Sequence, residues 1–263
     1  MDTLNETKGE RLKAAIAEME HRWGAGILAA SRAAPGRVEG LSTTFPALDQ
    51  LTGTGGIPLH AITLLSGDAT CGKLTVAYKV LSRAQLRTPE RRHSVAILDL
   101  GASSDPDYLA RSGVDLDRLL LVRPQGAKQA LRVLLDLVRS RELRAILLDS
   151  LSELLVDREG ASAVEQMMPQ VNLALKSADC ALLLLDDPQP AWLPPLASGT
   201  SRAVRHYASL HIEFAREGWI QSAGELTGYQ VKARLLKSRS QRQGERATVA
   251  ISFNETVRVR ETW

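Results

Sequence analysis

The sequence has few cysteines and lacks any long apolar run. Its only two cysteines, Cys71 and Cys180, cannot form a disulfide framework, and no His, Cys or acidic spacing is typical of a metal site. We therefore expect both to be reduced thiols in a cytoplasmic protein. The N-terminus carries no apolar signal segment, and runs such as 180–185 are far too short to span a membrane.

Aromatic residues are also scarce, at 4% of the chain, so we expect an aliphatic core of the kind found in parallel sheets. Lysine and arginine exceed the acids by only 33 − 30 = +3, which says little about partners. The distribution of charge says more, because one late segment holds six basic residues and a single acid, Glu245. The basic residues are Lys232, Arg234, Lys237, Arg239, Arg242 and Arg246. This segment is either a solvated loop or a surface for the phosphates of DNA or of a neighbour's nucleotide.

From residue 40 onward, short apolar segments alternate with helix-length segments. The pattern predicts strands over 61–65, 94–100, 119–123, 145–148 and 181–185. It predicts helices over 45–51, 74–85, 106–112, 128–140 and 163–178. Such alternation is typical of a parallel α/β sheet covered on both faces. Later segments alternate without helices and predict antiparallel strands added at one edge.

The first residues fall outside this alternation. Residues 10–23 place Leu12, Ala15, Ile16, Met19 and Trp23 on one helical face, and a short strand is expected at 27–28. We expect residues 1–36 to form an N-terminal oligomerisation segment with a linker, and residues 37–263 to form the α/β core.

A phosphate-binding loop is predicted between the strand at 61–65 and the helix that follows. The sequence from Gly67 to Lys73 matches G-x-x-x-x-G-K, in which glycines let backbone N–H groups surround phosphates and the lysine reaches their outer oxygens. The helix N-terminus adds a favourable field for an anion.

One position departs from the motif. Leu74 stands where a serine or threonine hydroxyl would bind Mg²⁺, and Thr75 points about 100° away on a helix. Asp149 follows four apolar residues and matches the second metal-associated acid, although an aspartate at a strand end is often only a turn or cap residue.

Several segments resemble the RecA family of bacterial recombinases across nearly the whole chain. They are KAAIAEMEHRWGAGIL, LSTTFPALDQLTGTGGIPLHAITLLSG, LDLGASSDPDYLARSGVDLDRLLL, AILLDS, RHYASLHIE and VKARLLKSR. The resemblance implies a P-loop NTPase fold of RecA type: a mostly parallel sheet with helices on both faces and antiparallel edge strands. It also implies ATP and Mg²⁺ as cofactors, and an N-terminal segment that docks on a neighbouring subunit.

The resemblance further implies roles for individual residues. The nucleotide-binding set is Gly67, Asp68, Ala69, Thr70, Cys71, Gly72, Lys73, Leu74, Thr75, Asp105, Tyr108 and Asp149. Asp105 and Tyr108 would bracket the adenine, although ordinary packing explains Tyr108 equally well. Lys237 and Arg239 would reach an adjacent subunit's phosphates, unless they only line a solvated strand edge. Contacts to single-stranded DNA would come from Trp192, Arg202 and Arg205, with Trp192 either stacking on bases or acting as a buried anchor.

Departures from the family pattern predict impaired or lost ATP hydrolysis. The family's catalytic glutamate lies two residues after the aspartate of the second core strand, here Asp99, and that position is Gly101. Asp187 replaces a glutamine that senses the γ-phosphate, and a carboxylate there repels phosphate unless it meets a cation. The segment between Asp149 and Asp187 is shorter than in the family, and a C-terminal regulatory domain is expected to be absent after Trp263.

Two functions are consistent with this pattern. The first is a RecA-like recombination and repair protein that binds ATP, and also single-stranded DNA, with impaired or lost hydrolysis. The second is a non-enzymatic adaptor similar to ImuA, acting beside RecA or a translesion polymerase in the SOS response. A fully active ATPase that uses Thr75 and another base is a third, weaker hypothesis.

Overall fold

The computed structural model describes residues 39–86, 93–187, 202–222, 224–239, 241 and 243–253, and ten residues of a helix between residues 10 and 22. The chain divides into two compact units, Met1–Arg37 and Val38–Trp263. In the first unit the described residues are helical, as predicted. Trp23, the strand expected at 27–28 and Trp192 lie outside the described residues.

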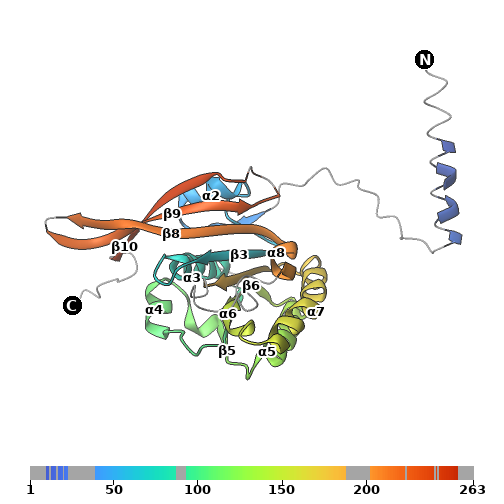
Figure 1. The fold of residues 1–263 in the computed structure, drawn as a ribbon, viewed down its shortest axis with the longest axis horizontal. Coiled ribbons are helices and arrows are strands. Elements are labelled where there is room, and N and C mark those ends of the chain that lie inside the picture. The colour runs from blue at the N-terminus through green and yellow to red at the C-terminus, as the bar shows by residue number, and fades with distance from the viewer. Residues whose placement is uncertain are drawn as a thin grey trace, which may run out of the picture. The chain divides into compact units, whose positions relative to one another are not determined.

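An eight-stranded sheet with the order β10-β9-β8-β3-β7-β6-β4-β5 forms the centre of the second unit (Figure 1). Its first five strands along the chain are β3 (Ala61–Gly67), β4 (Ser94–Asp99), β5 (Leu119–Val122), β6 (Leu143–Asp149) and β7 (Ala181–Asp186). The remaining strands are β8 (Ala208–Ser222), β9 (Glu225–Lys237) and β10 (Arg246–Ser252). Strand β8 pairs in parallel with β3, whereas β8–β9 and β9–β10 are antiparallel. The predicted parallel sheet with antiparallel edge strands is therefore confirmed.

Helices lie on both faces of this sheet (Figure 1). They are α2 (Pro46–Thr52), α3 (Lys73–Gln85), α4 (Pro106–Arg111), α5 (Ala127–Ser140), α6 (Leu151–Leu154), α7 (Arg158–Leu175) and α8 (Arg202–Tyr207), with a 3₁₀ turn η1 (Leu116–Arg118). A separate two-stranded sheet joins β1 (Gly40–Leu41) to β2 (Ile57–Pro58). Among the described residues, no helix has the length and apolar character needed to cross a membrane.

The core has two aliphatic layers, one on each side of the sheet. On β7, Leu183 and Leu185 point into the layer shared with α2, α3 and α4, whereas Leu182 and Leu184 point into the layer shared with α5, α6, α7 and α8. Successive side chains of a strand alternate between faces, so a strand buried on both faces must be apolar throughout. This explains the uninterrupted run from Ala181 to Leu185.

The observed bounds differ from the predicted ones at several strand and helix ends: β3 continues to Gly67, β6 runs from Leu143 to Asp149, and α7 ends at Leu175. The helix predicted over 163–178 begins earlier, at Arg158, because Asp157 caps it by accepting a hydrogen bond from Gly160 N at 2.7 Å. The short helix α6 was not predicted. Its four residues are too few to produce a recognisable helical period.

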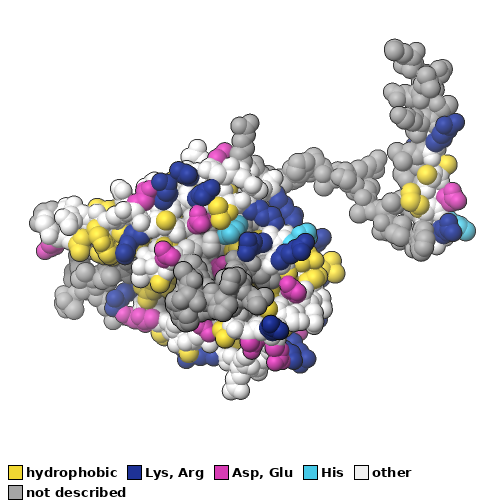
Figure 2. All heavy atoms as spheres, in the orientation of Figure 1, with side chains coloured by type: hydrophobic (Ala, Val, Ile, Leu, Met, Phe, Trp, Pro, Cys, Tyr) yellow, Lys and Arg dark blue, Asp and Glu magenta, His cyan; other side chains and the backbone are white. Residues whose placement is uncertain are grey.

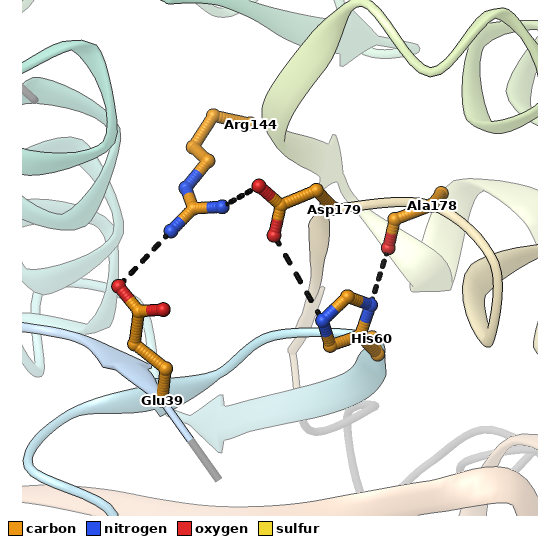
Figure 3. A network of polar contacts seen from close by, with 5 residues as sticks. All are labelled: Glu39, His60, Arg144, Ala178 and Asp179. Atoms are coloured by element: carbon orange, nitrogen blue, oxygen red, sulfur yellow. Dashed lines mark hydrogen bonds and ion pairs between the residues drawn. The ribbon is translucent and has the colours of Figure 1, made fainter.

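A buried arginine ties the two sheets together at the amino-terminal ends of β3, β6 and β7 (Figure 3). Arg144 contacts Asp179 through one guanidinium nitrogen and Glu39 Oε1 through the other, at 3.3 Å for Glu39. His60 donates from Nδ1 to the carbonyl of Ala178 at 2.6 Å and places Nε2 3.8 Å from Asp179. Because the Arg144 side chain is only 7% exposed, its carboxylate partners are needed to offset the loss of hydration.

Candidate nucleotide site

Acidic residues gather at the opposite edge of the sheet, where its parallel strands end. Asp99 ends β4 and lies in register with Asp149 at the end of β6, while Asp186 ends β7 in register with Ser66 of β3. The carboxyl edge of an open parallel sheet is where α/β proteins bind ligands. The predicted phosphate loop lies at this edge.

The loop runs from the end of β3 to the start of α3, and its two motif glycines occupy backbone conformations that other residues rarely adopt. Gly67 has φ +144° and Gly72 has φ +92°. A Cβ on Gly67 would lie 2.2 Å from Phe214 O, and one on Gly72 would lie 2.6 Å from Ile251 Cδ1. At Gly67 the backbone of β8 leaves no room for a side chain, whereas at Gly72 the positive φ is the main restriction, because the end of the Ile251 side chain can shift.

Lys73 begins α3, and its ammonium is held by the protein itself. Nζ donates to Gly67 O at 2.8 Å, to Asp68 O at 3.1 Å and to Asp187 Oδ1 at 2.5 Å. An ammonium has three donors, and these three oxygens use all of them. The lysine side chain is 7% exposed, so these contacts are well shielded from water. The sequence predicted that the carboxylate of Asp187 repels phosphate unless it contacts a cation, and the cation that it contacts is Lys73.

The position after Lys73 provides no metal ligand. Leu74 is partly buried and packs against the core layer beneath α3. Thr75 is buried, and its hydroxyl lies 2.6 Å from Tyr108 Oη, away from the loop. The Tyr108 ring also packs against Tyr78, with ring centroids 5.5 Å apart, and burial raises the pKa of Tyr108.

The position predicted to lack a catalytic base is open. Gly101 is exposed, and a Cβ there would meet only Ser103 Oγ, at 3.9 Å. The nearby Asp99 is not free to replace the base, because its buried carboxylate accepts from Ser103 N at 2.9 Å and from Arg123 Nε at 3.1 Å. Both oxygens of this carboxylate are thus already engaged by the protein, since Ser104 N also donates to Oδ2 at 3.3 Å.

Asp149 retains the predicted place beside the loop, in an environment that opposes its charge. Burial, followed by the nearby carboxylates of Asp187 and Asp99, raises the pKa of Asp149 to about 6, against a smaller opposing effect of Lys73. The described residues contain no cluster of three or more His, Cys, Asp or Glu side chains able to hold a metal ion. Asp149 is the acid that would face a bound cation here.

Asp105 and Tyr108, the predicted adenine pair, both lie at α4. Asp105 is exposed and caps this helix by accepting from Asp107 N at 2.9 Å. Tyr108 faces α3 through the hydroxyl of Thr75. The structure thus gives each residue an intramolecular role, and their contact with a base remains a prediction.

Lys237, which is predicted to reach a neighbour's phosphates, contacts Arg205, which is predicted to bind DNA. Lys237 Nζ donates to the carbonyls of Arg205 at 2.6 Å and His206 at 2.8 Å, at the end of α8. Burial, and then the charge of Arg239, lowers the pKa of Lys237. Arg239, Arg202 and Arg205 are exposed.

Acidic residues of β8 offset part of the basic segment. Glu217 binds Lys232 at 2.8 Å, and Glu213 lies 3.9 Å from Arg234. Acidic and basic side chains accordingly lie side by side over this part of the surface (Figure 2). Arg246 is exposed and also belongs to this face, which is of mixed charge rather than uniformly basic.

Two residues beside the loop were not anticipated from the sequence. His211 Nε2 lies 2.8 Å from Ser66 Oγ, and burial, aided by Arg205 and Lys237, lowers the pKa of His211 to about 4. It is therefore neutral at pH 7 and adds no positive charge to the loop. Arg216 donates to Thr70 Oγ1 at 3.5 Å while its guanidinium lies 4.6 Å from the centre of the Trp219 ring. Both come from β8, whose pairing with β3 no local sequence pattern reveals.

Comparison with known proteins identifies the family. The model of the RecA N-terminal domain matches residues 10–179. This chain belongs to the RecA family. Protein RecA of Aquifex pyrophilus is 28% identical over 278 residues, covering 98% of this chain and 78% of the relative. Protein RecA of Aquifex aeolicus is 28% identical with 97% and 78% covered, and that of Mannheimia haemolytica is 27% identical with 89% and 67% covered. The resemblance to RecA drawn from the sequence is therefore confirmed, whereas the roles predicted for single residues remain predictions.

Proposed function

We propose that this RecA-family chain is a cytoplasmic DNA recombination and repair protein that binds ATP and single-stranded DNA and hydrolyses ATP slowly or not at all. The observation that carries the proposal is the state of Lys73. Its ammonium is fully engaged by Gly67, Asp68 and Asp187, next to Leu74, which has no hydroxyl. Phosphate must replace an internal partner of this lysine before the lysine can act on it.

The loop retains the features that bind phosphate. Helix α3 begins at Lys73, and its N-cap residue, Gly72, provides no side-chain cap. The first turn of a helix carries N–H groups without intrahelical partners, and these favour an anion. The strained glycine conformations that shape the loop are also present. These features support binding of the phosphates of ATP.

The fit to Mg²⁺ is poorer. Leu74 supplies no ligand, the hydroxyl of Thr75 is bonded to Tyr108, and Asp149 alone faces the site from β6. The family's metal and base positions are thus both altered, since Gly101 has no side chain. Loss of a general base and of electrostatic stabilisation each typically costs about a hundredfold or more in rate.

A second candidate is an ImuA-like adaptor that acts through RecA or a translesion polymerase and needs neither DNA nor ATP turnover. The pairing of Lys232 with Glu217 and of Arg234 with Glu213 favours it, because paired lysines and arginines contribute less to phosphate binding.

Assembly on DNA separates the two candidates. If the chain acts as a RecA-like protein, ATP should promote its cooperative assembly on single-stranded DNA, with affinity falling as salt rises. Electron microscopy and fluorescence anisotropy over a salt series measure this, with Lys73→Met as the control that should lose the dependence on ATP. A chain that stays monomeric with ATP and DNA, yet binds a RecA or polymerase partner, would instead be the adaptor.

A further inference from the structure

The carboxylate of Asp187 occupies the place of an anionic ligand at Lys73. Its Oδ1 lies 2.5 Å from Nζ, so the two opposite charges are in direct hydrogen-bond contact. The other two donors of the ammonium are taken by carbonyl oxygens of the loop, Gly67 O and Asp68 O. No donor of Lys73 therefore remains for an added phosphate while Asp187 is in place.

The sheet fixes this contact. Strand β7 pairs in parallel with β3, and Ser66 lies opposite Asp186, so Asp187 emerges directly beside the first residues of the loop. Lys73 begins α3 and its side chain is 7% exposed, whereas that of Asp187 is 40% exposed. The lysine is consequently held in place while the carboxylate has access to solvent, which makes Asp187 the partner able to move away.

Further carboxylates make this region poor in positive charge. Burial is the main cause of the raised pKa of Asp149 at the end of β6, and the nearby charge of Asp187 is the next largest. Asp99 adds to the same effect. Arg123 is bound to Asp99, and His211 is neutral at pH 7. Two cations therefore lie beside the loop: Arg216, which donates to Thr70 Oγ1 at 3.5 Å, and Lys73, to which Asp187 is already bound.

We propose that Asp187 competes with the terminal phosphate for Lys73 and so makes this site prefer a nucleoside diphosphate to a triphosphate. The inference rests on the proposed function, because it assumes that the loop binds nucleotide. The lysine of such a loop reaches the outer phosphates, so a γ-phosphate must displace Asp187 or lie against its negative charge. A diphosphate bound to the N–H groups at the start of α3 carries less charge toward Asp187.

Binding of ADP and of a non-hydrolysable ATP analogue to the full chain tests this. We expect wild type to bind ADP at least about tenfold more tightly than the ATP analogue, since tenfold corresponds to a modest difference in charge interaction. Asp187→Asn keeps a hydrogen-bonding group but removes the charge, and it should tighten ATP binding at least about tenfold and bring the ratio close to one. Asp187→Glu retains the charge and should keep the preference for ADP.

Glu153→Gln is the matched control, because it removes an exposed carboxylate that acts on Asp149. If the preference for ADP comes from the contact of Asp187 with Lys73 and not from overall charge, this variant should keep the ratio of the two dissociation constants within about twofold of wild type. Isothermal titration calorimetry gives both constants, and thermal unfolding shows that each variant is folded.

Three results would overturn the inference. Wild type that binds the ATP analogue as tightly as ADP, with no change in Asp187→Asn, refutes the role of Asp187 while leaving nucleotide binding intact. If Glu153→Gln tightens binding of the ATP analogue as much as Asp187→Asn does, the preference arises from overall charge and not from the contact between Asp187 and Lys73. Failure of every variant, Asp187→Asn included, to bind either nucleotide refutes the proposed function as well.

Discussion

Asp149 is a residue whose charge the fold disfavours, and this has a consequence for stability. Its pKa rises from 3.8 to about 6 on folding, so the folded state holds the proton more tightly than the unfolded state. Stability from this group is fully present below pH 4 and is lost as pH rises through 6. Asp149→Asn should therefore stabilise the protein by about 1–3 kcal/mol near pH 7.5, with the gain disappearing near pH 4.

Urea denaturation of both proteins across this pH range measures the effect. Asp136→Asn serves as the control, because Asp136 is exposed on α5 and is not among the charges that act on Asp149, so it should leave the pH dependence close to that of wild type. A gain from Asp149→Asn that is equal at both pH values would show that ionisation of Asp149 is not its cause.

Gly72 shows that a motif glycine can be required for two reasons. Its φ of +92° and its contact with Ile251 predict that Gly72→Ala destabilises the nucleotide-free protein by about 1–3 kcal/mol. Gly101→Ala is the matched control, since that site is open, and it should change stability by less than about 0.5 kcal/mol. Equal effects in thermal unfolding would mean that the conformation at Gly72 is not restrictive.

Single residues also show which parts of the site could be predicted from the sequence. The glycines, Lys73 and Asp149 were placed at the loop because strand, motif and helix follow one another locally. The partner of Asp187 could not be named, because β3 and β7 are separated by more than a hundred residues. For the same reason, Arg216 beside Thr70 was missed. Arg123 and Asp99 are only 24 residues apart, but their contact depends on the pairing of β4 with β5, which no local pattern reveals.

At the scale of elements, Lys237 stabilises the end of α8. Its ammonium binds two carbonyls of that helix, at Arg205 and His206, where a positive charge also favours the helix dipole. We expect Lys237→Gln to lower the unfolding free energy by about 0.5–1.5 kcal/mol, and Arg239→Gln, at an exposed position two residues away, to change it little. Chemical denaturation of both variants without DNA or nucleotide gives this comparison, and equal values would leave the capping role unsupported.

Element types were predicted well where apolar runs were long. Strands β4, β6 and β7 are buried on both faces, and their central residues, 95–98, 145–148 and 181–185, are all apolar. The bounds of α7 were missed because its first turn is set by the cap at Asp157 rather than by a repeating apolar face.

At the scale of the whole molecule, the order of strands determines the chemistry available. Placing β7 between β3 and β6 brings Asp187 to Lys73 and brings both near Asp149. The α/β class and the antiparallel edge followed from the pattern of elements, whereas this spatial order is a long-range property of the fold. Membership of the RecA family accounts for this architecture.

ATP turnover, measured with and without single-stranded DNA beside a RecA from one of the matched bacteria, tests the central claim most directly. We predict that this chain is at least about a hundredfold slower, because we propose that Leu74 and Gly101 supply neither the metal ligand nor the general base that turnover uses. Leu74→Thr combined with Gly101→Glu should raise the rate at least about tenfold, since the open space at Gly101 admits a side chain. Turnover by the unmodified chain at the rate of that RecA would contradict the claim.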